Sequence, residues 1–170
     1  HLEPPPFEQV AARLRASEAA ARSLPTRFEA GRLLAEALTA AYRAGRRDWR
    51  DIDDGASVRA LHEWRKRVKL RRSLSVLVPM PTPVTGRSIQ TDLETLGEIL
   101  GEEHDLAVMK HRLEEEPALL TPGEGRDALF DLLAHRRRRL TRTALDLGSE
   151  LYDLRTRAFA AELDALSELC

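Results

Sequence analysis

The chain has 170 residues, which is the length of one domain with a hydrophobic core of its own. Because 27 Lys and Arg residues stand against 28 Asp and Glu, the net charge is near zero and by itself favours no polyanionic partner. The single cysteine, Cys170, excludes an internal disulfide and a metal site built from cysteines. No apolar run approaches the roughly 18 residues of a membrane span, so we expect a cytoplasmic protein without a membrane partner.

Helix-forming residues dominate the chain, and no stretch alternates with the period of a strand, which predicts an all-α fold. Residues 1–25 contain a proline-rich lead-in and one helix, expected over 7–23. Residues 26–170 are then expected to form a single antiparallel bundle, with five to six helices in the whole chain and short loops between them.

The second helix is expected over 26–46, with Gly31 and Gly45 on its apolar side, where they allow another helix to approach closely. A third helix is expected over 58–78, with Ser57 as its N-cap and a proline-rich segment after it.

Three more helices are expected over 88–115, 126–147 and 156–169. In the first two of these, apolar residues repeat at helical spacing and define a core-facing stripe. Gly148 is expected to interrupt the helix over 126–147 at its end.

The charges are segregated along the chain. Residues 42–72 contain eleven Lys or Arg against five Asp or Glu, whereas residues 92–116 contain nine Asp or Glu against two Lys or Arg. On the helix over 58–78, five basic side chains fall within an arc of about 120°: His62, Arg65, Lys66, Lys69 and Arg72. Like charges at this spacing repel one another, which favours a polyanionic ligand. The remaining arginines of this helix, Arg59, Arg67 and Arg71, are expected to be solvated.

The acidic helix over 88–115 offers a purely structural alternative, in which Glu98, Glu102 or Asp105 pairs with the basic helix and nothing else is bound. Further cations border the apolar stripes of other helices: Arg43, Arg46, Arg136 and Arg137.

His104 lies within an apolar stripe, a position typical of a hydrogen-bonded core histidine, and Asp105 beside it can orient an arginine or histidine across the bundle. The pair also raises the alternative of a metal-dependent phosphohydrolase of the HD type. Such an enzyme needs further ligands, and no spacing selects them among the available side chains: His62, His111, Asp127 and Asp131.

The segment HEWRKRVKLRR, followed downstream by LGEILGEEHDLAVM, resembles the CHAD family, the conserved histidine α-helical domain. The residues that match its basic element are His62, Arg65, Lys66, Lys69 and Arg72, and those that match its second helix are Leu100, Gly101, Asp105 and Val108. His104 stands where an arginine is frequent in the family. The resemblance covers residues 28–160 and is to the second half of the family's domain.

The resemblance implies a non-enzymatic helical domain that binds inorganic polyphosphate in a basic channel, with no cofactor and no metal, and that associates with polyphosphate granules. We therefore expect ten binding residues: Arg43, Arg46, His62, Arg65, Lys66, Lys69, Arg72, His104, Arg136 and Arg137. Asp105 is expected to be a structural partner. Since the family has two similar halves and this chain has one copy of the basic element, we expect either a homodimer or a longer protein that supplies the first half. A nucleic-acid-binding protein is the alternative, although aromatic stacking residues are scarce.

Overall fold

A computed structural model of the chain describes residues 27–53, 55–78, 82–120 and 123–167. They form five α-helices: α2 (Arg27–Arg50), α3 (Val58–Val76), α4 (Arg87–Glu115), α5 (Glu124–Leu151) and α6 (Thr156–Ser167). A short 3₁₀ helix, η1 (Pro117–Leu119), lies between α4 and α5. The predicted all-α fold is confirmed in this part of the chain, whereas the helix expected over 7–23 lies outside the described residues.

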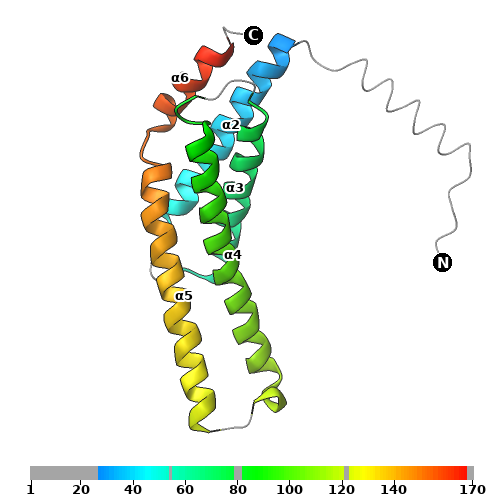
Figure 1. The fold of residues 1–170 in the computed structure, drawn as a ribbon, viewed down its shortest axis with the longest axis vertical. Helices are drawn as coiled ribbons and strands as arrows, with labels where there is room; N and C mark the ends of the chain where they lie inside the picture. The colour runs from blue at the N-terminus through cyan, green and yellow to red at the C-terminus, as the bar shows by residue number, and fades with distance from the viewer. Residues whose placement is uncertain (1–26, 54, 79–81, 121–122, 168–170) are drawn as a thin grey trace, which may run out of the picture.

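From α2 to α5, successive helices run in opposite directions along the molecule, whereas α6 continues in the direction of α5 (Figure 1). α2 packs against α3, α3 against α4, and α4 against α5, while α6 returns to pack against α2. Because the connections between them are short, each helix from α2 to α4 lies antiparallel to the next, as the sequence predicts. The prediction is wrong for α6, which continues in the direction of α5 (Figure 1). α3 is therefore held between α2 on one side and α4 on the other.

α4 and α5 are much longer than the helices beside them. They have 29 and 28 residues against 19 in α3, which corresponds to about 43 Å against about 28 Å of helix. Their lower halves consequently extend beyond α2 and α3 as a two-helix hairpin (Figure 1). The main hydrophobic cluster lies in the other half of the molecule, where all five helices contribute.

Trp64 and Tyr152 lie at the centre of this core, each with no exposed surface. The rings of Tyr42 on α2 and Phe159 on α6 stack at 3.9 Å between centroids, which fastens the last helix to the bundle. The core is completed by aliphatic residues of four helices, including Leu38, Leu61, Val68, Leu93, Leu96, Leu100 and Leu163. Burial of these side chains provides the main driving force for the fold.

The predicted cap of α3 is confirmed, since the side chain of Ser57 accepts a hydrogen bond of 3.2 Å from the amide of Ala60. The predicted interruption at Gly148 is wrong, because α5 continues to Leu151. Two tryptophans pack onto this position instead: a Cβ on Gly148 would lie 2.7 Å from Cδ1 of Trp49 and 3.0 Å from Cζ2 of Trp64. Gly148 is thus a helix-interior residue that makes room for indole rings.

The expectation of close helix approach is confirmed at Gly45, where a Cβ would collide with the hydroxyl of Tyr152. At Gly31, no atom of the described residues lies within 4 Å of the Cβ position. The predicted solvation of Arg71 is also wrong, because it is only 2% exposed. It belongs to the buried stripe of α3, one turn after Val68. Arg59 is exposed as expected, whereas Arg67 is half-buried and lies 3.6 Å from Asp48.

Replacement of Gly148 by alanine should destabilise the protein by about 1–3 kcal/mol, because the added methyl group must displace two packed indole rings. The helix propensity of alanine offsets only about 1 kcal/mol of this cost. The matched control is Gly97→Ala on α4, where no atom lies within 4 Å of the added methyl and stability should rise. Chemical denaturation followed by far-ultraviolet circular dichroism measures both changes; equal effects of the two substitutions would contradict the packing assigned to Gly148.

Candidate functional site

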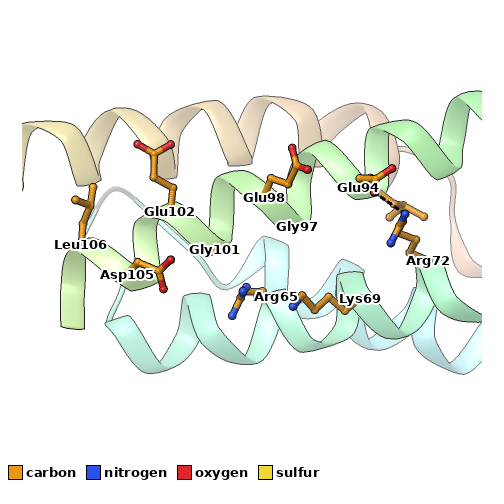
Figure 2. Close-up of a pocket in the computed structure, with 11 residues that line it drawn as sticks. Arg65, Lys69, Arg72, Glu94, Gly97, Glu98, Gly101, Glu102, Asp105 and Leu106 are labelled. Atoms are coloured by element: carbon orange, nitrogen blue, oxygen red, sulfur yellow. Dashed lines mark hydrogen bonds and ion pairs between the residues drawn. The ribbon is translucent and has the colours of Figure 1, made fainter. Parts of the chain in front are cut away.

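A groove with a volume of about 470 Å³ runs between α3 and α4. One wall is basic and consists of Arg65, Lys69 and Arg72 from α3. The other wall comes from α4 and carries four carboxylates: Glu94, Glu98, Glu102 and Asp105 (Figure 2). The structure therefore brings three of the predicted binding residues into one row, with the predicted structural partner Asp105 opposite them.

Two glycines of α4, Gly97 and Gly101, form the floor of the groove. A Cβ on Gly101 would lie 3.2 Å from Nη2 of Arg65. The absence of a side chain therefore lets the guanidinium of Arg65 lie against the backbone of α4. Nε of Arg65 is buried there and has no hydrogen-bond partner among the described residues.

The groove charges are only partly paired. Arg72 donates a hydrogen bond of 2.6 Å to Glu94, and Glu102 accepts two hydrogen bonds, of 2.8 and 2.6 Å, from Arg136 of α5. In the described part of the chain, Arg65 and Lys69 form no ion pair. Figure 2 shows Asp105 pointing toward α3 and Glu98 pointing away from it. The basic wall thus keeps two cations without a carboxylate partner.

His62 and His104 face each other across the same helix pair. Their ring centroids lie 4.8 Å apart with an interplanar angle of 38°, and Nδ1 of each ring is buried without a hydrogen-bond partner among the described residues. The expected hydrogen-bonded core histidine is therefore a member of a histidine pair. The pair lies one helical turn beyond Arg65 and Gly101, so it borders the end of the groove.

A protein-family model for the CHAD domain matches residues 2–114, about two thirds of the chain. The chain belongs to the CHAD family. The match contains α2, α3 and nearly all of α4, and thus the groove and both histidines, but it ends before α5. It begins and ends earlier than the predicted span of 28–160. No curated protein and no solved structure matches the chain.

Outside the groove, two predicted binding residues of this CHAD protein lie on α2. Arg43 is exposed, and Nε of Arg46 donates a hydrogen bond of 2.9 Å to the backbone carbonyl of Tyr152. Lys66 on α3 is held 3.0 Å from Glu63, and this hydrogen bond lowers the pKa of the Glu63 carboxyl below its ordinary value. The basic residues expected to act together are thus divided among several surfaces.

The carboxylates of α4 that form ion pairs differ from those predicted. Glu94, which the sequence reasoning did not select, pairs with the basic helix, whereas Glu102 pairs with α5. Glu103 is a second missed residue: its carboxylate is 1% exposed and lies 2.6 Å from Nη2 of Arg137. Its burial could have been inferred from its position one turn after Leu100 and one turn before Ala107 in the apolar stripe.

The described residues contain no group of three or more His, Cys, Asp and Glu side chains placed to hold a metal ion. The HD-type phosphohydrolase therefore gains no support from this part of the chain. Within the same residues, no helix combines the length and the apolar composition that a membrane crossing requires.

Replacement of Arg137 by methionine should destabilise the protein by about 3–5 kcal/mol, since it leaves the carboxylate of Glu103 buried without its cation. Adding Glu103→Leu to this variant should restore most of the loss, because the buried charge is then absent. Arg136→Met, which breaks the exposed pair with Glu102, should cost about 1 kcal/mol or less. Urea denaturation of the three variants tests the assignment, and a large effect of Arg136→Met with a small one of Arg137→Met would overturn it.

Proposed function

We propose that this protein binds inorganic polyphosphate along the basic wall of the α3–α4 groove and that it does so without catalysis. The observation that carries the proposal is the row formed by Arg65, Lys69 and Arg72, of which the first two have no carboxylate partner among the described residues. Members of the CHAD family bind polyphosphate, and the family match contains this row.

Each cation of the row suits a different contact with a phosphate chain. The planar guanidinium of Arg65 presents a fork of N–H donors that matches two phosphate oxygens, whereas the ammonium of Lys69 acts as a mobile point charge. Arg72 is engaged by Glu94 at 2.6 Å, so phosphate must compete with a carboxylate for it. Arg65 and Lys69 are therefore the principal contacts, and Arg72 extends the row at one end.

The opposite wall limits the affinity. Asp105 points toward α3 (Figure 2), where it repels a bound polyanion. Since Glu94 and Glu102 are paired with arginines, the repulsion comes mainly from the carboxylates without such partners. Binding then depends on direct contacts and on released counterions rather than on long-range attraction, and it should weaken as salt is raised.

Nucleic acid presents the same phosphate chemistry, but it also needs surfaces for its bases. The groove lining contains no aromatic side chain, and four of the eight aromatic residues of the chain are buried in the core: Tyr42, Trp64, Tyr152 and Phe159. Base stacking, which contributes much of single-strand binding, has no platform here. Polyphosphate should therefore displace duplex DNA or RNA from the protein at low concentration, and the reverse displacement should fail.

The groove has a single basic wall. We therefore also propose that one polyphosphate chain bridges the basic rows of two copies of this protein. Sedimentation of the protein with and without long-chain polyphosphate measures this association. Dimers that form only with polyphosphate would support it, and a monomer saturated with one chain would contradict it.

The double substitution Arg65→Gln with Lys69→Gln should weaken polyphosphate binding by about 100-fold or more at physiological salt, because each of the two charge-assisted contacts contributes about 1.5–3 kcal/mol. It should also lower the dependence of the binding constant on salt by about two released ions. The matched control removes two exposed arginines elsewhere, Arg59→Gln with Arg139→Gln, and should change little. Calorimetric titration measures the effect; equal losses in both variants would contradict a localised site.

Removing the facing carboxylate should have the opposite effect. Asp105→Asn should strengthen polyphosphate binding several-fold, since a unit charge a few ångströms from a bound phosphate is worth about 1 kcal/mol at a hydrated surface. Glu98→Gln makes the same change of charge on a side chain that points away from α3 (Figure 2) and should have a smaller effect. Weaker binding by the Asp105 variant would show that this carboxylate supports the site instead of opposing it.

A further inference from the structure

Arg71 is a buried cation on the side of α3 that faces away from the groove. It is 2% exposed, and its guanidinium carbon lies 4.9 Å from the ring centroid of Tyr42, 5.2 Å from that of Tyr152 and 5.3 Å from that of Phe159. Nη1 donates a hydrogen bond of 2.9 Å to the carbonyl of Leu151. Nε has no hydrogen-bond partner, and no carboxylate pairs with this arginine among the described residues.

The surroundings compensate this charge only in part. Leu151 is the last residue of α5, and a helix C-terminus carries about half a negative charge. The three aromatic faces add a cation–π attraction. Burial lowers the pKa of the Arg71 guanidinium below its ordinary value. An arginine stays protonated in such a place, so an anionic group is the missing component.

A cavity of about 310 Å³ lies against Arg71 at the end of the bundle. Its floor contains the buried Tyr42 and Phe159, and its walls include the aliphatic Ile89 and Leu154. Three exposed carboxylates stand around the opening: Glu150, Asp153 and Glu162. This cavity shares no lining residue with the α3–α4 groove.

We propose that this cavity binds a small zwitterion of the apolar α-amino-acid class. The ligand carboxylate pairs with the guanidinium of Arg71, the ammonium group faces the carboxylates of the opening, and the apolar side chain packs on Ile89 and Leu154. A phosphate or polyphosphate ligand does not fit this charge pattern, because three carboxylates surround the entrance and repel a multivalent anion. A simple amine does not fit either, since it leaves Arg71 without a counter-charge.

Three probes of nearly the same shape distinguish a zwitterionic ligand from an amine and from a carboxylate in the intact protein. L-leucine has both charged groups, 3-methylbutylamine lacks the carboxylate, and 4-methylpentanoate lacks the ammonium group. Chemical-shift titration should show that L-leucine binds and that each of the other two binds at least about tenfold more weakly, a factor that corresponds to one lost charge-assisted contact. No shift change with L-leucine at millimolar concentration, or equal binding of the amine, would overturn the proposal.

Arg71→Leu tests the role of the buried cation. An unpaired buried charge is costly, so its replacement by an apolar residue should leave the variant with its helical circular dichroism. It should lose L-leucine binding and retain polyphosphate binding, because Arg71 does not line the groove. L-leucine binding that survives in the folded variant would refute the site.

If the Arg71 variant does not fold, the double substitution Glu150→Gln with Glu162→Gln at the exposed opening gives the second test. L-leucine binding should fall in this variant, and unchanged binding would refute the role of the carboxylates.

Discussion

The register of α3 against α4 determines where the charged groups of the groove lie. In the facing pairs His62 with His104, Arg65 with Gly101, and Arg72 with Glu94, the two residue numbers add to the same total of 166. A single antiparallel alignment therefore places the histidines together and lays the guanidinium of Arg65 against a glycine. It also forms the ion pair between Arg72 and Glu94 across the groove. A shift by one residue would turn the basic row by about 100° on its helix and disperse all three contacts.

This alignment also explains why an acidic helix beside a basic one leaves cations without partners. The carboxylates of α4 are distributed around its circumference, so that Glu94 reaches α3 while Glu102 and Glu103 reach arginines of α5. Gly97 and Gly101 occupy the positions nearest to the middle of the basic row, where a glutamate would have neutralised it. The near-zero net charge of the chain conceals this arrangement, because it is the direction of the side chains, and not their number, that determines the local field.

The sequence alone predicted the helices of the described region correctly, because hydrophobic periodicity and capping are local properties. It failed where the decisive contact was distant in the chain. Arg71 was assigned to solvent from its charge, but its neighbours in the stripe, Trp64 and Val68, are fully buried, and the carbonyl of Leu151 that accepts its hydrogen bond is 80 residues away. The prediction that Gly148 breaks the helix fails for the same reason, because the indole rings that it accommodates come from other helices. The contact between Arg65 and Gly101 could have been predicted from the sequence, because a long cationic side chain packs well against a residue without a side chain.

The two faces of α3 depend on each other. Because Trp64, Val68 and Arg71 are fixed in the core, α3 cannot rotate about its axis, and the direction of the basic row is fixed before any ligand arrives. Arg65 is half-buried against α4 and has already lost much of its side-chain freedom, so the proposed contact to phosphate would order it at little further entropic cost. Lys69 is exposed, which would let it follow a flexible chain. For the proposed binding, Arg72 would first have to exchange Glu94 for a phosphate oxygen. The row thus contains a rigid cation, Arg65, an exposed one, Lys69, and one that is already paired, Arg72. The packing of aromatic and aliphatic side chains on the opposite face of α3 holds all three in their positions along the groove.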